Sequence, residues 1–426
     1  MNAPRHWLAP HRVTPLDATV SVPGSKSLTN RALVLAAIAD APSTLSHPLD
    51  SRDTSLMAEA LVSLGATIER DNEAWTVTPI PVDNRQGPVT IDCGLAGTVM
   101  RFVPPLAALC HTDVTFDGDA RARQRPMATT IDTLRRLGVM VDDGGRGSLP
   151  FTVQGRGSLD GGMLEIDASA SSQFVSALLL AGSRFGQGLD LRHVGAALPS
   201  LPHIDMTVTE LRRRGVRVDS STPDRWVVEP GKVAALDDEI EPDLSNAGAF
   251  VAAALVTGGR VRVRHWPQAT TQAGDAWRDI AVAFGGTATR DGDDLVFAAT
   301  GPLHGVDLDL HDVGELTPVV AAIAALAEGP SRLTGVAHLR GHETDRLAAL
   351  VAEIRGLGGE AHELDDGLLI TPRPLHGGVV RTYDDHRMAH AAVVLGLRVP
   401  DLLVDDIAAT AKTYTDFADV WERLVS

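Results

Sequence analysis

A polar stretch, Pro23-Gly24-Ser25-Lys26-Ser27-Leu28-Thr29-Asn30-Arg31, runs directly into the apolar segment from Ala32 to Ile38. Its glycine, proline and hydroxyl side chains predict a loop that caps a helix, and the apolar segment predicts that this helix is buried. Such a helix start favours anions, because its free N–H groups and its dipole attract negative charge. Lys26 and Arg31, expected near one face of the first turns, would add charge-assisted hydrogen bonds. An ordinary capped helix with exposed cations fits the same stretch equally well.

The same combination of a polar start and an apolar helix recurs along the whole chain. Five further polar starts precede segments rich in Ala, Leu and Val, at residues 94–98, 170–173, 243–246, 314–317 and 384–387. Helices that are apolar nearly all round are buried, so six buried helices with polar N-termini are expected. If the repeats pack symmetrically, three to a domain, these N-termini converge at one end of each domain. Two such ends facing each other would form a cleft.

A second pattern, a helix followed by glycine and a strand, alternates with the first. Its glycines are spaced 70 to 77 residues apart, at Gly65, Gly138, Gly215, Gly285 and Gly358. Glycine suits the end of a helix, where a left-handed backbone is needed. Each copy is expected to continue into a turn and a second strand, for example at residues 75–79, 226–229, 295–298 and 368–371. The chain is therefore predicted to be an α/β protein of repeated αβ units, each about 70 residues long.

The length of 426 residues exceeds what a single core usually supports, so two domains are expected. The third repeat ends near residues 239–242, which places one three-repeat domain at residues 24–241 and the other at residues 1–23 with 242–426. The alternating segment from Ala18 to Val22 is expected to pair back with the C-terminal half of the chain. Two chain crossings between the domains would then form a hinge.

Charge and apolar pattern argue against several classes of protein. A net charge of −17 at pH 7 disfavours a nucleic-acid or anionic-membrane surface, which would need a basic face. No apolar run approaches the roughly 18 residues of a membrane span, and residues 1–7 lack the apolar segment of a signal peptide. A cytoplasmic protein is expected, in which Cys93 and Cys110 are buried small residues rather than a disulfide.

Six motifs in order carry a resemblance to a known family. They lie at Gly24–Arg31, Leu95–Arg101, Ser171–Gln173, Glu343–Arg346, Asp384–Met388 and Thr410–Thr413. With these motifs at matching spacing over almost its full length, the chain closely resembles 5-enolpyruvylshikimate-3-phosphate synthases. The resemblance implies the enolpyruvyl transferase-like fold, with two similar domains of three repeated αβ units. It also implies a place in the shikimate pathway of aromatic amino-acid biosynthesis and glyphosate as an inhibitor.

The resemblance implies a reaction between shikimate 3-phosphate and phosphoenolpyruvate, with no metal and no organic cofactor. The 5-hydroxyl of the first adds to C2 of the second, and inorganic phosphate leaves through a tetrahedral intermediate. Each substrate brings a phosphate and a carboxylate, and Arg suits such groups because it can donate two parallel hydrogen bonds. These small molecules are the expected partners of a monomeric enzyme that binds neither nucleic acid nor membrane.

The resemblance also assigns residues to each substrate. Phosphoenolpyruvate is expected to bind Lys26, Gly97, Arg125, Gln173, Arg346, Arg387 and Lys412. Shikimate 3-phosphate is expected to bind Lys26, Ser27, Arg31, Ser171, Ser172, Gln173, Ser200, Glu315 and His342. Arg101 is expected to contact these side chains rather than a substrate.

Two proton transfers need catalytic groups, one that removes the hydroxyl proton and one that protonates the methylene carbon of phosphoenolpyruvate. Glu315 stands where the family usually has Asp and is assigned as the base. Glu343 is the candidate acid-base group at the methylene carbon, and the elimination step is open to either Glu315 or Glu343. Lys26 and His386 are the candidate proton partners.

Five positions depart from the residues usual in the family. They are Leu95 for Asn, Phe102 for Pro, His203 for Tyr, His338 for Asn and His342 for Lys. The changes at Leu95 and Phe102 bear on the shape of the phosphoenolpyruvate pocket, and therefore on sensitivity to glyphosate. His342 can still donate a hydrogen bond to a substrate hydroxyl, but its charge depends on pH.

Other functions fit part of the pattern. A UDP-N-acetylglucosamine enolpyruvyl transferase has a similar repeated fold, although that family usually has Asn after the lysine that corresponds to Lys26. A P-loop kinase needs Gly-x-x-x-x-Gly-Lys-Ser/Thr, and here Ser25 precedes the lysine. A non-catalytic repeat protein that binds anions would not need both Glu315 and Glu343.

Individual motifs also have simpler interpretations. The pairs Ser171-Ser172 and Asp384-Asp385 fit helix caps. The segment Glu343–Arg346 fits a solvated helix start with Glu in its first turn. His338 and His342 have a spacing that a metal could use, but no further ligand cluster accompanies them in the sequence.

Overall fold

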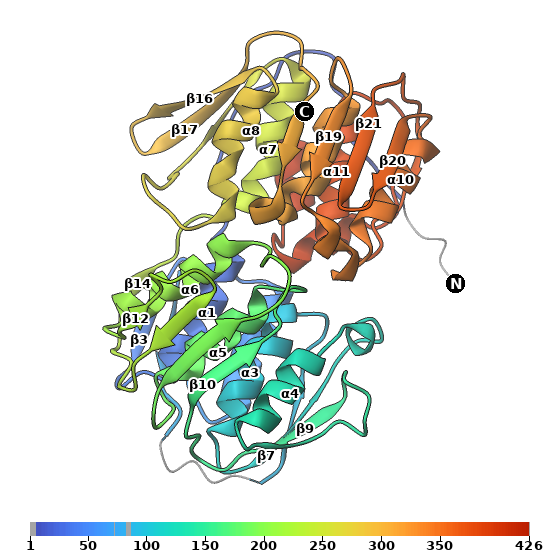
Figure 1. Ribbon diagram of the computed structural model, residues 1–426. Coiled ribbons are helices and arrows are strands. Elements are labelled where there is room, and N and C mark those ends of the chain that lie inside the picture. Colours follow the sequence, from blue (N-terminus) through green and yellow to red (C-terminus); the bar gives the residue numbers. More distant parts are fainter. Residues whose placement is uncertain (1–5, 72, 82–86, 426) are drawn as a thin grey trace. The chain divides into compact units, whose positions relative to one another are not determined.

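The computed structural model describes residues 6–71, 73–81 and 87–425 and divides into two compact units (Figure 1). Unit 1 comprises Met1–Pro23 with Glu241–Ser426, and unit 2 comprises Gly24–Ile240. The expected boundary put Glu241 in the other domain. Its carboxylate accepts hydrogen bonds from Thr270 and Gln272, which hold it in unit 1. Residues 1–5, on which part of the expectation for the N-terminus rested, lie outside the described residues.

Unit 2 contains three repeats, and each has a four-stranded sheet. The sheets have the strand orders β14-β3-β5-β4, β6-β7-β9-β8 and β10-β11-β13-β12, with one parallel and two antiparallel pairs in each. Along the chain the elements are α1 (Lys26–Ala37), β3 (Ser43–Ser46), α2 (Arg52–Ser63), β4 (Thr67–Arg70), β5 (Ala74–Thr78), β6 (Val89–Asp92), α3 (Gly97–Ala108), β7 (Asp113–Asp117), α4 (Ala128–Arg136), β8 (Met140–Asp142), β9 (Phe151–Gln154), β10 (Gly162–Ile166), α5 (Gln173–Gly182), β11 (Leu189–His193), α6 (Leu201–Arg213), β12 (Val218–Asp219), β13 (Arg225–Val228) and β14 (Asp238–Glu239).

Unit 1 repeats the arrangement twice and then varies it. Its sheets are β16-β17-β15-β2, β18-β19-β21-β20 and the three-stranded β1-β23-β22. The elements are β1 (Trp7–Leu8), β2 (Asp17–Val20), α7 (Leu244–Thr257), β15 (Arg260–Val263), α8 (Trp277–Ala283), β16 (Gly286–Asp291), β17 (Asp294–Ala299), β18 (Asp307–Asp309), α9 (Thr317–Ala325), β19 (Ser331–Thr334), α10 (Arg346–Gly356), β20 (Glu360–Leu364), β21 (Gly367–Thr371), β22 (Gly378–Val380), α11 (His386–Gly396), β23 (Leu402–Val404) and α12 (Phe417–Val425).

The chain passes between the units twice, once after β2 and once after β14. β2 pairs in parallel with β15 of unit 1, yet the chain continues from it into α1 of unit 2. β14 pairs in parallel with β3 of unit 2 and continues into α7 of unit 1. The expectation that residues 18–22 pair with the C-terminal half is confirmed by β2. The two linkers are joined where Asp243 N donates to Pro23 O at 2.8 Å.

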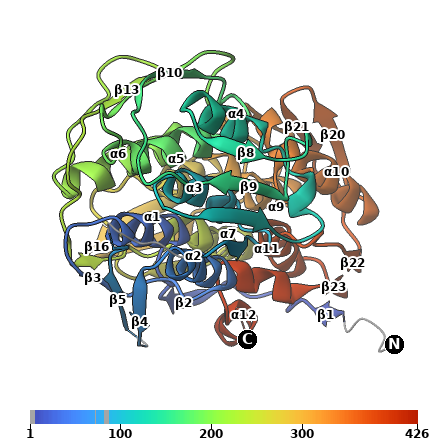
Figure 2. The same ribbon diagram turned by 90° about the horizontal axis from the view of Figure 1, so that it is seen from below.

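The six apolar helices form the cores of the two units, as predicted. Helices α1, α3 and α5 contact one another in unit 2, with the strands around them, and α7, α9 and α11 do so in unit 1 (Figures 1 and 2). Their first turns lie at the same end of each unit, because Asn30 of α1 donates to Thr98 of α3 and Arg387 of α11 donates to Asn246 of α7. The expected convergence of polar helix starts is therefore present within each unit.

The helix–glycine–strand pattern is confirmed at all five positions. The glycines have positive φ angles of 106°, 83°, 75°, 92° and 87°, which a residue with a side chain rarely adopts. Two of them also have a histidine ring against them. A Cβ at Gly285 or Gly358 would come within 2.9 Å of the ring of His304 or His376, respectively. Both histidines belong to a Pro-Leu-His-Gly sequence, at 302–305 and 374–377, a second mark of the repeat that our sequence analysis missed.

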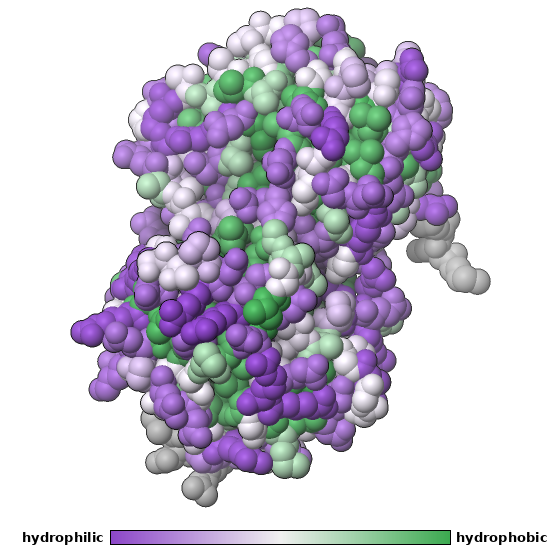
Figure 3. Space-filling view, viewed as in Figure 1, coloured by the Kyte–Doolittle hydropathy of each residue, from purple (hydrophilic) through white to green (hydrophobic). Residues whose placement is uncertain are grey.

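The outer surface is mostly polar. The visible face of each unit is mainly hydrophilic or neutral, with apolar residues in small separate patches (Figure 3). Within the described part of the chain, no helix combines the length and the apolar character needed to cross a membrane. Cys93 and Cys110 are free and buried as predicted, and burial raises the pKa of the Cys110 thiol to about 11.

Candidate active site

The first turn of α1 directs its two cations to different neighbours. Ser25 caps the helix, accepting from Leu28 N at 3.4 Å. Lys26 Nζ lies 3.3 Å from Oδ2 of Asp53 in α2, and both side chains are largely buried. Arg31 instead points toward α6. The prediction that the two cations share one face of the first turns is therefore wrong, because five residues turn a helix well past one revolution.

Arg31 is a buried cation held by neutral groups. Its guanidinium donates to Thr207 Oγ1 and His203 O, both at 2.8 Å, and to Ser27 O at 2.9 Å. Its side chain also lies over the Phe102 ring at 5.3 Å, so this departure from the usual proline gives the cation an aromatic support. Burial lowers the pKa of Arg31 to about 10. No carboxylate in the described residues forms an ion pair with Arg31, so its charge is available to an anion.

A second group of cations surrounds the start of α3. Arg125 is buried and donates to Leu95 O at 3.3 Å, and it has no carboxylate ion pair within the described ranges. A Cβ on Gly97 would lie 2.8 Å from Arg101 and 3.1 Å from Arg125, so only glycine leaves both guanidinium groups in place. Arg101 donates to the side-chain oxygen of Gln173 at 2.9 Å and therefore orients that amide. Leu95 contributes its backbone oxygen to this group, and its side chain is buried in the core of unit 2.

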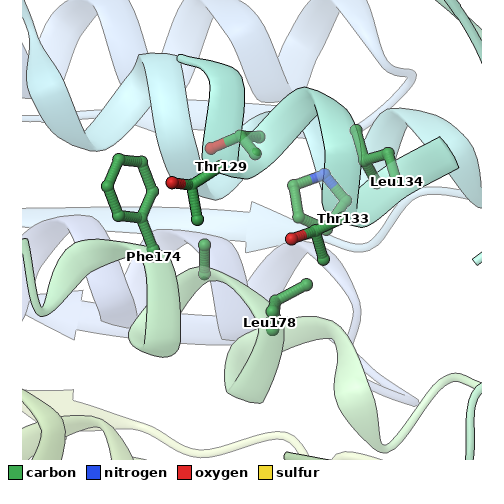
Figure 4. Close-up of a pocket in the computed structure, with 8 residues that line it drawn as sticks. Thr129, Thr133, Leu134, Phe174 and Leu178 are labelled. Carbon is green, nitrogen blue, oxygen red and sulfur yellow. The ribbon is translucent and has the colours of Figure 1, made fainter. Parts of the chain in front are cut away.

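Phe174 connects this group to a small apolar cavity. The guanidinium of Arg101 lies over its ring at 5.2 Å. Phe174 and Leu178 of α5 line the cavity opposite Thr129 and Thr133 of α4 (Figure 4). Unit 1 has a cavity at the equivalent place, between α9, α10 and α11. Both cavities lie among the helices, and none of the predicted substrate-binding residues lines either of them.

Of the serines predicted to hold shikimate 3-phosphate, Ser27 lies in the first turn of α1, and the other three lie at the starts of α5 and α6. Ser172 occupies the N-cap position of α5 without a side-chain capping bond, while Ser171 Oγ accepts from Gln173 N at 3.3 Å. Ser200 precedes α6 with a left-handed backbone, φ 55°, and its hydroxyl likewise makes no capping bond. The capping interpretation therefore holds for Ser171 alone.

In unit 1, Glu343 lies between two cations. Lys412 Nζ donates to its Oε1 at 2.6 Å, and Arg346 donates to its Oε2 at 3.2 Å. Arg346 also forms a two-pronged pair with Asp385, at 2.8 and 3.1 Å. Burial opposes ionisation of Arg346, but the charges of Asp385 and Glu343 outweigh it and raise the pKa of Arg346. These groups are at most 10% exposed, so a solvated helix start is excluded.

Arg387, in the first turn of α11, differs from Arg346. Asp385 caps this helix and accepts from Arg387 N at 2.9 Å. The Arg387 guanidinium is buried and donates to Oδ1 of Asn246 at 3.3 Å, and it forms no carboxylate ion pair within the described residues. Burial lowers the pKa of Arg387, with partial opposition from the charges of Asp243 and Glu315.

Glu315 lies in the kinked 3-10 segment His311–Leu316 before α9 and is half-buried. Its charge acts on Arg346, Arg387 and His338, which places it in the same group as the Glu343 cluster. His342 accepts from Arg346 at 3.3 Å. His386 is buried with Nδ1 3.7 Å from Asp385.

His338 stands between two other histidine rings, with centroids 6.2 Å from His311 and 5.8 Å from His342. Burial, with the charge of His311, lowers the pKa of His338 to about 4, so it is neutral at physiological pH. No group of three or more His, Cys, Asp and Glu side chains in the described ranges is arranged to hold a metal.

The contacts join the predicted site residues of unit 1 into one group, whereas those of unit 2 stay apart. In unit 2, Gly97, Arg125 and Gln173 lie around the start of α3, while Lys26 pairs with Asp53 and Arg31 lies against α6. The group in unit 1 comprises Glu315, His342, Glu343, Arg346, His386, Arg387 and Lys412. Sequence reasoning missed Asp53 and Asn246, and took Asp385 only for a cap. Asp385 lies 39 residues from Arg346, and no local spacing signals that pair.

The fold defines the class of protein. The structure of EPSP synthase from Acinetobacter baumannii matches with a TM-score of 0.80 at 23% sequence identity, covering 98% of this chain and 97% of that one. The enolpyruvyl transferase NikO from Streptomyces tendae matches with a TM-score of 0.74 at 19% identity, covering 97% and 96%. The two-unit architecture is the enolpyruvyl transferase fold.

Sequence comparison then gives the family. The family model described as EPSP synthase (3-phosphoshikimate 1-carboxyvinyltransferase) matches residues 10–421. The 3-phosphoshikimate 1-carboxyvinyltransferase of Kocuria rhizophila is 57% identical over 443 aligned positions, which cover 98% of this chain and 96% of that protein. The chain belongs to the EPSP synthase family, and the resemblance inferred from its six motifs is confirmed.

Proposed function

We propose that this chain transfers the enolpyruvyl group of phosphoenolpyruvate to the 5-hydroxyl of shikimate 3-phosphate, a step of the shikimate pathway. Family membership supports the reaction. The observation that carries the mechanism is Glu343, a largely buried carboxylate within hydrogen-bonding distance of Lys412 and Arg346. A proton-transfer group among cations that can bind an anionic substrate is what an addition to phosphoenolpyruvate requires.

The reaction balances without a redox partner. The hydroxyl oxygen forms a bond to C2 of phosphoenolpyruvate and gives up its proton, while the methylene carbon gains one. The tetrahedral intermediate then loses a proton from the resulting methyl group, and the C2–O bond to phosphate breaks. Glu315 removes the hydroxyl proton, Glu343 transfers the proton at the methyl carbon, and Lys26 and His386 are their proton partners.

Unit 2 mainly binds shikimate 3-phosphate. Arg31, Ser171 and Ser172 supply a cation and hydroxyls for its phosphate, and Lys26, Ser27, Gln173 and Ser200 complete this set. Support comes from the guanidinium of Arg31, which is buried without a carboxylate ion pair in the described residues and can therefore gain energy from an anion.

Unit 1 carries the acid-base carboxylates and part of the phosphoenolpyruvate site. Arg346, Arg387 and Lys412 bind this substrate together with Lys26, Gly97, Arg125 and Gln173 of unit 2. The anionic groups of phosphoenolpyruvate compete with Glu343 for Lys412 and Arg346, so binding loosens the contacts that hold this carboxylate. Glu315 and His342 contact the hydroxyls of shikimate 3-phosphate.

Phosphate release from phosphoenolpyruvate tests the proposal. Release with shikimate 3-phosphate, and none with UDP-N-acetylglucosamine, is the expected result. Release with the sugar nucleotide instead would identify the sister activity. No release with either acceptor, together with phosphoenolpyruvate binding, would indicate a protein that binds anions without catalysis.

We further propose a cytoplasmic monomer whose partners are its small-molecule substrates, and glyphosate as an inhibitor. The net charge of −17 supports the lack of a nucleic-acid or anionic-membrane partner. Light scattering of the purified chain measures the oligomeric state. Inhibition of phosphate release by glyphosate, in competition with phosphoenolpyruvate, tests the inhibitor.

A further inference from the structure

Asn246 is a fully buried amide in the first turn of α7. Its Nδ2 donates to the backbone oxygen of Thr413 at 2.9 Å, and its Oδ1 accepts from Thr413 Oγ1 at 3.1 Å and from Arg387 at 3.3 Å. The backbone oxygen can only accept and the guanidinium can only donate, so the orientation of the amide is fixed by its partners. One side chain therefore joins three parts of unit 1: α7, α11 and the chain at Thr413, directly after Lys412.

The contact with Arg387 leaves its charge intact. A carboxylate at this place would pair with the guanidinium and compete with an anionic ligand. An amide oxygen holds the same N–H group and carries no charge, so the buried cation keeps its capacity for an anion. Arg346, which Asp385 and Glu343 hold, shows the other arrangement in the same unit.

The contacts with Thr413 act on Lys412. Thr413 directly follows Lys412, and Asn246 binds both its backbone oxygen and its hydroxyl. These bonds fix the backbone from which the Lys412 side chain extends to Glu343. Helix capping does not require the amide, because Asp243 already accepts from Asn246 N at 2.9 Å.

We propose that Asn246 is a positioning residue that sets Arg387 and Lys412 at the spacing phosphoenolpyruvate needs. The inference rests on the proposed function, which assigns both cations to this substrate. It adds a residue with no expected contact of its own with either substrate. Its consequence is that changes at Asn246 alter phosphoenolpyruvate binding selectively.

Steady-state kinetics of three variants tests this role. Asn246→Asp keeps the shape but places a carboxylate against Arg387, and we expect KM for phosphoenolpyruvate to rise about tenfold or more. KM for shikimate 3-phosphate is expected to stay within about twofold. Thr413→Val removes the hydroxyl bond and should give a smaller rise, while Thr413→Ser retains it and should behave as the unmodified protein. Ser245→Ala, one residue away, is the matched control. Equal increases in both KM values, or none for Asn246→Asp, would overturn the proposal.

Direct binding separates this inference from the proposed function. Calorimetry measures phosphoenolpyruvate binding to the unmodified chain, to Asn246→Asp and to Ser245→Ala, with circular dichroism as the check on folding. If the unmodified chain releases no phosphate, the proposed reaction fails, while weaker binding by Asn246→Asp alone still supports the positioning role. Unchanged binding in Asn246→Asp contradicts it. Should that variant not fold, Thr413→Val with Thr413→Ser provides the same comparison.

Discussion

The two units hold their buried cations in different ways. In unit 2, Arg31 and Arg125 are held by carbonyl oxygens, a hydroxyl and an aromatic ring. In unit 1, Arg346 and Lys412 are held by the carboxylates of Asp385 and Glu343. Neutral partners keep a positive charge ready for an anion, whereas carboxylates fix the cations and add groups that can move protons. In the function that we propose, one repeated fold thus supplies a half that mainly binds and a half that carries the acid-base carboxylates.

Each unit has one cation whose partner is of the kind found in the other unit. Lys26 of unit 2 pairs with Asp53, and Arg387 of unit 1 is held by an amide. Lys26 is also the cation of unit 2 that we assign to proton transfer, whereas Arg387, like Arg346 and Lys412, is assigned to phosphoenolpyruvate binding. The kind of partner therefore follows the unit for most of these cations, and Lys26 and Arg387 depart from it.

Removing the reactive carboxylate should have the largest effect. Glu343→Gln keeps the shape of the side chain and ends its proton transfer, so we expect kcat to fall by about 10² to 10⁴. Phosphate release under saturating substrates measures it. A fall of less than threefold would mean that Glu343 only fixes Lys412 and Arg346.

Replacing one arginine in each unit tests the comparison in terms of stability. Arg346→Met leaves Asp385 and Glu343 buried beside an apolar group and should cost about 3–5 kcal/mol of unfolding free energy. Arg31→Met removes a buried charge that has only neutral partners, and the free energy should change by about 1 kcal/mol or less, with loss of shikimate 3-phosphate binding. Urea unfolding measures both variants. Equal destabilisation would show that the two units do not differ in this respect.

Shikimate 3-phosphate should stabilise unit 2 more than unit 1. At a hundred times its Kd, a ligand adds about 2.7 kcal/mol to the folded state that binds it. We expect hydrogen exchange to slow most in the first turns of α1 and α5, and least in β16 and β17. Equal protection of both regions would contradict a binding role centred on unit 2.

The last prediction concerns a buried group of unit 1 that has neither a carboxylate nor a neutral hydrogen-bond partner in the described structure. His390 is fully buried, one turn after His386, and neither ring nitrogen has a hydrogen-bond partner in the described structure. Its ring lies 4.5 Å from that of Phe417. Burial, together with the nearby charge of Arg387, lowers the pKa of His390 well below 6.5.

Because the unfolded chain takes up a proton at this histidine below pH 6.5 and the folded chain does not, stability falls as the pH is lowered. His390→Leu should add about 1 kcal/mol at neutral pH by removing two unsatisfied nitrogens. The gain should grow by up to about 1.4 kcal/mol for each pH unit below 6.5. Urea unfolding between pH 7 and 5 measures it, and a gain independent of pH would contradict the shifted titration.

The sequence predicted those features whose signal is local. The six apolar helices, the positive-φ glycines and the extended segment at residues 18–20 follow from periodicity and residue type within short windows. The site residues came from motifs that carry the resemblance, and their roles stay predictions. A second strand was expected in every copy, and β9 supplies it in the second repeat, where the sequence analysis named no bounds.

The partners of the site residues could not be predicted, because they come from distant parts of the chain. Asp53 lies 27 residues from Lys26, and Thr207 lies 176 residues from Arg31. Whether a buried cation meets a carboxylate or an amide depends on how the repeats pack, which no single motif records. The wrong prediction for Arg31 has a local cause instead, since the five-residue step from Lys26 to Arg31 turns a helix well past one revolution.

Because the chain passes between the units after β2 and again after β14, its parts assemble in a definite order during synthesis. All of unit 2 leaves the ribosome before α7 does, so that unit can fold while β1 and β2 have no sheet to join. β2 must wait for β15, and β1 for β23, whose last residue is Val404. At the usual 5–20 residues per second, this wait lasts about 10 to 30 s after unit 2 is complete. The start of the chain is therefore exposed longest, and chaperones that bind extended apolar segments would have most time to act there.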